Sequence, residues 1–311
     1  MKNIKWAICG LGRISGVFLE ACKNVDGAEI VAAASSDKGR AEEFAVKHKL
    51  RYAYTYEELY NSKKIDAVYV ATNMNMHCPN TLGLLANRIP VLCEKAFCLD
   101  ETEAEKMIAA AKQNDVLLME AMWTRFLPAT LEVSEIINSG KLGEIKRING
   151  VFKADMSDNP ECRVFKKELG GGSLLDLGVY LAAYANMLLG APMDIKASGT
   201  VKDGVDYNCR MELTHKNGVK AELYSSITEP YQALIEITCQ NGKISVPNFF
   251  NAAVFEADGK EYKFEDKYHG FVYQIRHFCE LLRQGKKESP IQTFEDTSRV
   301  MKVLSQAEQQ L

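Results

Sequence analysis

The fold is decided by the stretch Lys5-Trp6-Ala7-Ile8-Cys9-Gly10-Leu11-Gly12-Arg13-Ile14-Ser15. Its first five residues form an apolar run typical of a short buried strand, and a helical spacing begins at Ile14. Between them Gly10 permits a tight turn, and Gly12 lets another group approach the backbone. We therefore predict a dinucleotide-binding unit in which the helix N-terminus, with Arg13 and Ile14, offers N–H groups to a pyrophosphate. The alternative is a plain turn in an unrelated α/β protein.

Apolar runs alternate with helical stretches as far as residue 122. The expected strands are 5–9, 28–35, 65–72, 90–94 and 116–120, and the expected helices are 14–24, 39–48, 80–87 and 102–114. This rhythm predicts an N-terminal α/β domain, residues 1–122, with a doubly wound parallel sheet and helices on both faces.

The pattern changes in residues 123–311. A helix at 128–139 is followed by strand-like runs at 145–154, 194–202, 206–214, 218–227, 231–239 and 242–247. Asn217-Gly218 and Asn241-Gly242 are hairpin signals. Further helices are expected from Ser173, at 269–285 and at 293–310. We predict an α+β domain with an open, mostly antiparallel sheet, whose C-terminal helix either stays with it or packs back on the first domain.

Composition excludes several classes of protein. Of 311 residues 47% are hydrophobic, and the net charge is −3, so no basic surplus indicates nucleic-acid binding. Residues 177–193 approach the length of a membrane span, but Asn186, Gly190 and Pro192 interrupt them, so we expect a buried helix. No signal-peptide pattern is seen at the N-terminus. The nine cysteines are scattered without a CxxC pair, which favours reduced thiols in the cytoplasm and no metal site.

The end of the second strand bears on the choice of cofactor. An acidic residue that holds the ribose hydroxyls is usual there in NAD-binding proteins. This chain has Ser35 and Ser36 instead, with Lys38 and Arg40 nearby, which suits a 2′-phosphate. Asp37 either turns toward the ribose or belongs to a solvated turn. We expect NADP, with NAD as the alternative.

Chemistry-bearing residues also follow the later strands of the first domain. Glu94 and Lys95 come directly after an apolar strand, where parallel sheets bind ligands, so Lys95 is aimed at the working end of the cofactor or is a surface lysine. Asn73 and His77 follow the strand before it and are weaker candidates on the same side.

A second glycine-rich stretch begins the helix expected from Ser173. Gly170, Gly171 and Gly172 form a turn that permits a very close backbone approach. The α-helical spacing then places Asp176 and Tyr180 on one face. A capping box with Ser173 explains Asp176 without catalysis, and a core position explains Tyr180.

Taken together, these pieces resemble the Gfo/Idh/MocA oxidoreductase family over nearly the whole chain. The resemblance is carried by Gly10 to Ser15, Ala71-Thr72-Asn73 with His77, Glu94-Lys95, and Gly170 to Gly172 with Asp176 and Tyr180. The run from Met119 to Pro128 and the Gly-Gly-Gly…Asp-Leu-Gly-Val-Tyr run are similar to the dimeric dihydrodiol dehydrogenase branch.

The resemblance implies a Rossmann domain, a second domain whose open sheet forms a homodimer or higher oligomer, and a nicotinamide cofactor. It implies a catalytic Lys95, the helix carboxylate Asp176, and Tyr180 where many members have His. Its cofactor-binding positions include Ala71, Thr72, Asn73, His77, Glu94, Trp123 and Arg125. The triple-glycine turn is then expected to face the nicotinamide. Two departures are Ala96 in place of a proline after the lysine, and Ser36 in place of an arginine.

The expected reaction is hydride transfer between nicotinamide and a CH–OH or C=O carbon of a sugar, polyol, diol or related carbonyl compound. An ordinary tyrosine has a pKa near 10. Either Tyr180 moves the proton with Lys95 as the cation that lowers its pKa, or Lys95 is the proton donor and Tyr180 orients the substrate. A non-catalytic ligand sensor on the same fold and a Rossmann methyltransferase are the rival functions.

Overall fold

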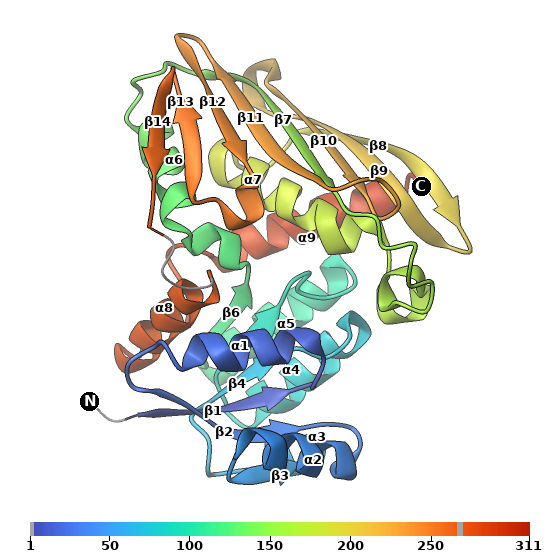
Figure 1. The fold of residues 1–311 in the computed structure, drawn as a ribbon, viewed down its shortest axis with the longest axis vertical. Coiled ribbons are helices and arrows are strands. Elements are labelled where there is room, and N and C mark those ends of the chain that lie inside the picture. Colours follow the sequence, from blue (N-terminus) through green and yellow to red (C-terminus); the bar gives the residue numbers. More distant parts are fainter. Residues whose placement is uncertain (1–2, 266–269) are drawn as a thin grey trace. The chain divides into compact units, whose positions relative to one another are not determined.

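The computed structural model describes residues 3–265 and 270–311 (Figure 1). It divides into two compact units, Met1–Trp123 with Tyr268–Phe294, and Thr124–Lys267 with Glu295–Leu311. We describe each unit by itself. The expected helix at 269–285 begins at a residue outside the described ranges.

Among the described residues, the first unit is built on a six-stranded sheet in the order β3-β2-β1-β4-β5-β6. Every neighbouring pair is parallel, which confirms the predicted parallel sheet. The strands are β1 (Ile4–Cys9), β2 (Ala28–Ala34), β3 (Tyr52–Tyr54), β4 (Ala67–Val70), β5 (Val91–Glu94) and β6 (Leu118–Ala121). The short β3 was missed, because three half-buried residues at the sheet edge are too few to stand out as a strand.

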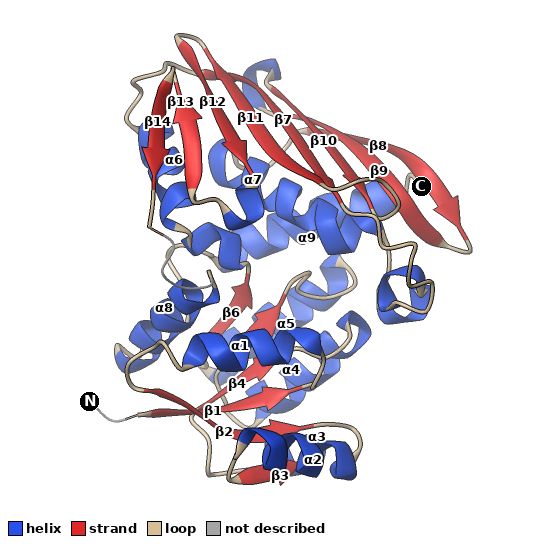
Figure 2. Ribbon diagram, viewed as in Figure 1, coloured by secondary structure: helices blue, strands red, loops and turns tan. Residues whose placement is uncertain are grey.

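Helices flank this sheet on both sides (Figure 2). They are α1 (Arg13–Cys22), α2 (Lys38–His48), α3 (Tyr56–Tyr60), α4 (His77–Ala86), α5 (Glu101–Asn114) and α8 (Phe271–Arg283). Local chemistry explains where several begin. Asp100 caps α5 by accepting the Glu103 N–H at 2.8 Å, and Thr55 with Glu58 forms a capping box at α3.

The core of the first unit explains why α8 returns to it. The Trp6 side chain on β1 is fully buried and packs against Phe18 of α1 and Phe278 of α8, with ring centroids 5.5 and 5.0 Å away. Arg283 also donates to the Gly27 carbonyl at 3.1 Å. The predicted domains, residues 1–122 and 123–311, therefore differ from the structure, in which α8 belongs to the first unit. Amphipathic spacing predicts that a helix is buried, but it does not predict which unit the helix packs against.

Among the described residues, the second unit is built on an eight-stranded sheet in the order β14-β13-β12-β11-β7-β10-β9-β8. All neighbours are antiparallel except β7 and β10, so the predicted mostly antiparallel sheet is confirmed. Its strands are β7 (Ile145–Lys153), β8 (Asp194–Lys202), β9 (Val205–Thr214), β10 (Lys220–Ser226), β11 (Gln232–Cys239), β12 (Gly242–Pro247), β13 (Val254–Ala257) and β14 (Lys260–Lys263). The last two were missed, since they are short and carry charge.

Helices cover one face of this sheet: α6 (Pro128–Asn138), α7 (Val179–Leu189) and α9 (Phe294–Glu308). A Cβ built on Gly150 of β7 would lie 3.0 Å from the Leu181 side chain, so α7 lies directly on the strand. The helical stretch Lys167–Leu189 is long and apolar enough to cross a membrane by composition alone, but 83% of its apolar window is buried inside the protein. It is therefore the core helix of this unit.

Candidate active site

The glycine turn after β1 brings two neighbouring strand ends into contact. Gly10 has φ +93°, and a Cβ built there would lie 2.5 Å from the backbone N of Thr72. The Gly10 carbonyl accepts a hydrogen bond from the buried Ser15 hydroxyl at 2.6 Å. Ala71 N–H donates to the Cys9 carbonyl at 2.7 Å, whereas Asn73 is exposed. Position 10 therefore requires glycine, and the loops after β1 and β4 lie against each other.

The N-terminus of α1 fits a dinucleotide pyrophosphate. Its N-cap is Gly12, no side chain caps the helix, and its first turn carries no acid. A Cβ built on Gly12 would meet nothing within 4 Å, so the space beside this backbone is open. The N–H groups of a first helical turn attract phosphate oxygens. The turn formed by Gly12, Arg13 and Ile14 can therefore accept this part of a dinucleotide.

Asp37 has a role that neither sequence interpretation included. Its Oδ1 accepts the Arg40 N–H at 2.7 Å, so Asp37 is the N-cap of α2. Ser35 is buried, and its hydroxyl accepts the Asp37 N–H at 3.2 Å. Ser36 is exposed beside them. The carboxylate is therefore engaged by the helix backbone.

The two basic residues expected near a 2′-phosphate differ in their surroundings. Lys38 Nζ donates to the Ala53 carbonyl at 2.9 Å and to the Glu58 carboxylate. Arg40 is exposed, and within residues 3–265 and 270–311 no ion pair engages it. Arg40 is therefore the better placed of the two to receive an external anion.

A buried carboxylate holds the backbone from which Lys95 projects. Glu94 is 6% exposed and accepts the Tyr69 hydroxyl through Oε1 at 2.5 Å and the Lys95 N–H through Oε2 at 3.1 Å. Tyr69 is fully buried and stacks on Phe18 at 3.8 Å. Lys95 itself is half-buried. Glu94 thus acts inside the protein to fix the start of the Lys95 segment.

His77 joins the loops that follow β4 and β5. Its buried ring places Nδ1 3.0 Å from the Ala96 carbonyl oxygen and Nε2 3.1 Å from the Thr72 carbonyl oxygen. The adjacent Lys95–Ala96 peptide bond is cis. Both ring nitrogens contact the protein backbone, so His77 holds the Thr72 and Ala96 loops together beside Lys95.

The triple-glycine turn in the second unit approaches the protein's own chain. Gly172 has φ +121°, and a Cβ there would lie 1.9 Å from Oδ1 of Asp206 at the start of β9. A Cβ on Gly171 would lie 2.6 Å from the Val164 carbonyl oxygen. The turn is therefore needed for packing against Asp206 and residues 163–166. The close backbone approach that these glycines permit is therefore to the protein's own chain.

The segment after the turn begins as a π-helix, Leu174–Gly178, before α7 starts. Ser173 does not cap it, and Asp176 instead pairs with Arg163, Nη2 to Oδ1 at 2.5 Å, so the capping box is wrong. Tyr180 is 8% exposed and its ring lies 5.7 Å from that of Phe152. The common face expected for Asp176 and Tyr180 assumed α-helical spacing, which a π-turn alters; such turns are frequent at functional sites.

Asp206 is the residue that sequence reasoning missed. Its Oδ2 accepts the Ser173 hydroxyl and the Leu174 N–H, each at 2.7 Å. Burial raises the pKa of this carboxyl to about 6. No pattern connects residue 206 with a helix start 33 positions earlier, so only the folded sheet reveals the contact.

Trp123 and Arg125, both predicted near the nicotinamide, belong to different units. Trp123 is buried and packs edge-on against Phe271 with ring centroids 5.5 Å apart. Arg125 is 9% exposed, and its Nη2 lies 3.6 Å from Oδ2 of Asp296. The Arg125 contact ties α9 to the start of the second unit.

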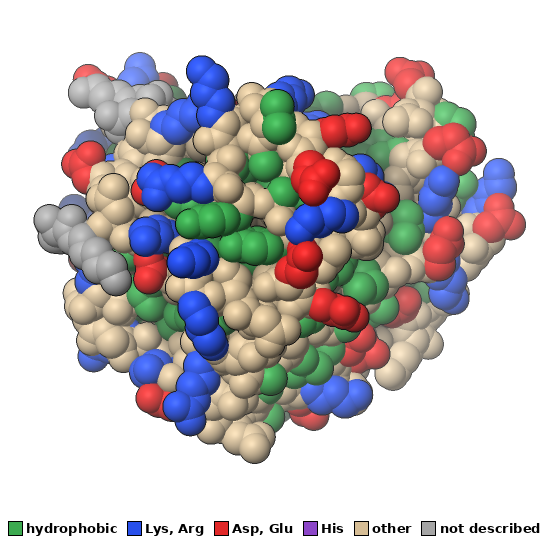
Figure 3. Space-filling view, turned by 90° about the horizontal axis from the view of Figure 1, so that it is seen from below, with side chains coloured by type: hydrophobic (Ala, Val, Ile, Leu, Met, Phe, Trp, Pro, Cys, Tyr) green, Lys and Arg blue, Asp and Glu red, His purple; other side chains and the backbone are tan. Residues whose placement is uncertain are grey.

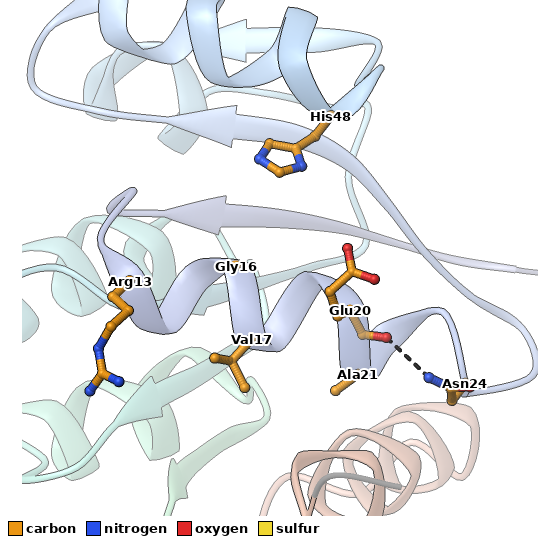
Figure 4. Close-up of a pocket in the computed structure, with 7 residues that line it drawn as sticks. All are labelled: Arg13, Gly16, Val17, Glu20, Ala21, Asn24 and His48. Atoms are coloured by element: carbon orange, nitrogen blue, oxygen red, sulfur yellow. Dashed lines mark hydrogen bonds between the residues drawn. The ribbon is translucent and has the colours of Figure 1, made fainter.

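A hollow of about 550 Å³ runs along the side of α1 (Figure 4). Arg13 lies at one end, Asn24 at the other, and His48 of α2 faces the helix between them. Of the candidate residues Arg13 lines it, whereas Thr72 and Lys95 do not.

Three further features of the described residues bear on their chemistry: possible metal ligands, cysteines and surface charge. No group of three or more His, Cys, Asp or Glu side chains within them could hold a metal ion. All nine cysteines are free, and eight are buried. On the face shown in Figure 3, Lys and Arg side chains are interspersed with Asp and Glu.

Comparisons with known proteins agree across the whole chain. Residues 4–122 match the family described as "Oxidoreductase family, NAD-binding Rossmann fold", and residues 130–245 match the GFO/IDH/MocA C-terminal domain. The chain is 33% identical to trans-1,2-dihydrobenzene-1,2-diol dehydrogenase of Xenopus tropicalis, over 99% of this chain and 98% of that protein. It is 32% identical to scyllo-inositol 2-dehydrogenase (NADP(+)) IolU of Bacillus subtilis, over 99% and 97%.

A solved structure shares both the fold and recognisable sequence. KijD10, a 3-ketoreductase from Actinomadura kijaniata in complex with NADP and TDP-benzene, superposes with a TM-score of 0.84 at 26% identity. The match covers 97% of this chain and 96% of that one. The likeness therefore extends over both units.

Proposed function

The chain belongs to the GFO/IDH/MocA oxidoreductase family with an NAD-binding Rossmann domain, and on that premise we propose its substrate, cofactor and catalytic residues. We propose an NADP-preferring dehydrogenase or reductase that acts on a CH–OH or C=O group of a sugar, polyol, diol or related carbonyl compound.

The observation that carries this proposal is the order of loops along one edge of the first sheet. The glycine turn, Thr72 and Lys95 follow β1, β4 and β5, which are neighbours in the sheet. In open parallel sheets ligands bind outside the carboxyl ends of the strands. Lys95, fixed by buried Glu94, therefore lies along the edge that also carries the pyrophosphate turn.

A bound nicotinamide supplies the hydride chemistry, and the protein handles the proton. In the proposed reaction the Tyr180 hydroxyl exchanges a proton with the substrate oxygen. The Lys95 ammonium stabilises negative charge on that oxygen and lowers the pKa of a tyrosine acting as base. Asp176 orients the substrate, with its carboxylate oriented in turn by Arg163. In the alternative, Lys95 donates the proton directly and Tyr180 orients the substrate.

The substrate class follows from the relatives. Their names describe action on a dihydrodiol and on scyllo-inositol, both of which carry neighbouring secondary alcohols. We therefore expect vicinal diols and polyols, or the corresponding ketones, to be turned over. Cofactor absorbance measured with a panel of sugars, inositols, diols and dicarbonyls in both directions tests this. If ligands bind but none is turned over, the ligand-sensor alternative replaces the proposal.

We expect Arg40 to set the preference for NADP. Replacing Arg40 by Ser removes a charged donor to the 2′-phosphate, and such a hydrogen bond is worth about 1.5–3 kcal/mol, roughly a tenfold to hundredfold loss of NADP affinity. NAD affinity should stay unchanged. Titration calorimetry with both cofactors measures this, with Lys47→Ser on the same helix as the control. An equal loss for both cofactors would show that Arg40 does not contact the 2′-phosphate.

The outer face of the second sheet suits a homodimer contact. Val151 is paired with Leu234 on one side and Tyr224 on the other, and all three are half-buried. Arg147 and Glu222 form an ion pair at 2.6 Å on the same face. An apolar row flanked by paired charges is typical of an interface that excludes water.

We expect the protein to sediment as a dimer and Val151→Asp to sediment as a monomer, because a charge in an apolar contact is costly to desolvate. Lys260→Asp, on the edge strand β14, is the control and should remain dimeric. A Val151→Asp variant that stays dimeric would place the interface elsewhere.

We also propose a cytoplasmic location, since free thiols persist in a reducing compartment.

A further inference from the structure

We propose that Asp206 is a positioning residue for the reaction, one that fixes the start of the helix carrying Asp176 and Tyr180. This inference rests on the proposed function, in which those two side chains meet the substrate. Asp206 itself contacts neither, so its effect on the reaction passes through the helix.

Asp206 binds the two residues at which the π-helix starts. Its Oδ2 accepts both the Ser173 hydroxyl and the Leu174 N–H at 2.7 Å. The absence of a Cβ on Gly172 leaves the room that Oδ1 occupies. The carboxylate therefore replaces the side-chain cap that the helix itself lacks.

The same helix start is also held by the next strand. Ser173 Oγ lies 3.0 Å from Ser225 Oγ of β10, and a Cβ on Gly178 would lie 3.2 Å from that same oxygen. Ser173 and Ser225 are fully buried. The π-helix is thus seated on β9 and β10 through a buried polar cluster in which Asp206 is the charged acceptor.

Removing that acceptor leaves the buried Leu174 N–H without its partner and leaves the Ser173 hydroxyl to Ser225 alone. A buried donor left unsatisfied costs about 1–3 kcal/mol, which the chain can avoid by shifting the helix start toward another acceptor. Asp176 lies two residues beyond Leu174, and Tyr180 follows within six. Because a misplacement of about 1 Å can cost roughly a hundredfold in rate, such a shift is expressed in kcat.

The test compares Asp206→Ala with Ile244→Ala, a variant of a buried residue on β12 that lowers stability in the same unit without touching the helix start. We expect Asp206→Ala to lower kcat by about tenfold to a hundredfold, with Kd for NADP unchanged. Asp206→Asn, which retains an acceptor oxygen, should recover part of that loss. Ile244→Ala should keep kcat near wild type at a comparable loss of melting temperature.

Hydrogen exchange gives a readout that needs neither cofactor nor substrate. In Asp206→Ala the amides of residues 174–180 should exchange faster than in the wild type, whereas in Ile244→Ala they should not. Wild-type kcat in Asp206→Ala, or unchanged exchange of those amides, would overturn the inference. Activity in Lys95→Met would instead count against the proposed function, so the two failures are distinguishable.

Discussion

Replacing Lys95 by Met should lower turnover by about a thousandfold, because the change removes the cation that stabilises charge on the substrate oxygen. Met has a similar length and is unbranched, so the loop after β5 should keep its structure. Its backbone is held by Glu94 and, through Ala96, by His77, contacts that do not involve the Lys95 side chain. Steady-state rates and NADP fluorescence titration on the same preparation measure the two quantities.

NADP affinity is the control within that experiment and should change by less than about threefold, an effect below 1 kcal/mol. Lys64→Met, at an exposed position of the same unit, is the matched variant and should retain full turnover. Near-normal turnover of Lys95→Met would remove Lys95 from the mechanism. Loss of NADP binding together with turnover would make it a binding residue.

Gly10 and Gly12, two residues apart, should respond to alanine in opposite ways. At Gly10 the added Cβ would lie 2.5 Å from the backbone N of Thr72, at φ +93°. Overpacking costs about 1–3 kcal/mol and a strained backbone about as much again, so Gly10→Ala should lose several kcal/mol of the free energy of unfolding. Denaturant melts of the cofactor-free protein measure this.

At Gly12 the added methyl group meets no neighbour, so stability should change by less than about 0.5 kcal/mol. The methyl group would instead occupy the open space beside the helix N-terminus, and NADP affinity should fall by about tenfold or more. Gly16→Ala, inside α1 and equally open, is the control for both measurements. Unchanged NADP affinity in Gly12→Ala would show that the pyrophosphate does not lie at this turn.

The first unit was largely predictable because its signals are local. An apolar strand, a glycine turn and a helix lie within residues 4–22, and the same rhythm repeats. What escaped prediction depends on distant partners. The helix α8 (Phe271–Arg283) belongs to the first unit through contacts such as that of Phe278 with Trp6, which no periodicity reveals.

The candidate site shows the same limit. Glycine at 170–172 correctly indicated a close backbone approach, but the partner is Asp206 from a strand that follows more than 30 residues later. The three-residue spacing of Ser173 and Asp176 suggested a capping box. In the folded chain Ser173 instead donates a hydrogen bond to Asp206, and Asp176 pairs with Arg163. Residue types therefore predicted which groups could form hydrogen bonds and ion pairs, whereas only the structure shows which residues are partners.

Transfer of a labelled hydride tests the central claim most directly. The panel substrate with the highest turnover, deuterated at its reacting carbinol carbon, is incubated with the enzyme and NADP, and the reduced cofactor is examined by mass spectrometry. The proposed function predicts one deuterium in each reduced cofactor and a Lys95→Met variant that forms almost none. Unlabelled reduced cofactor, or substrate binding without any reduction, would contradict it.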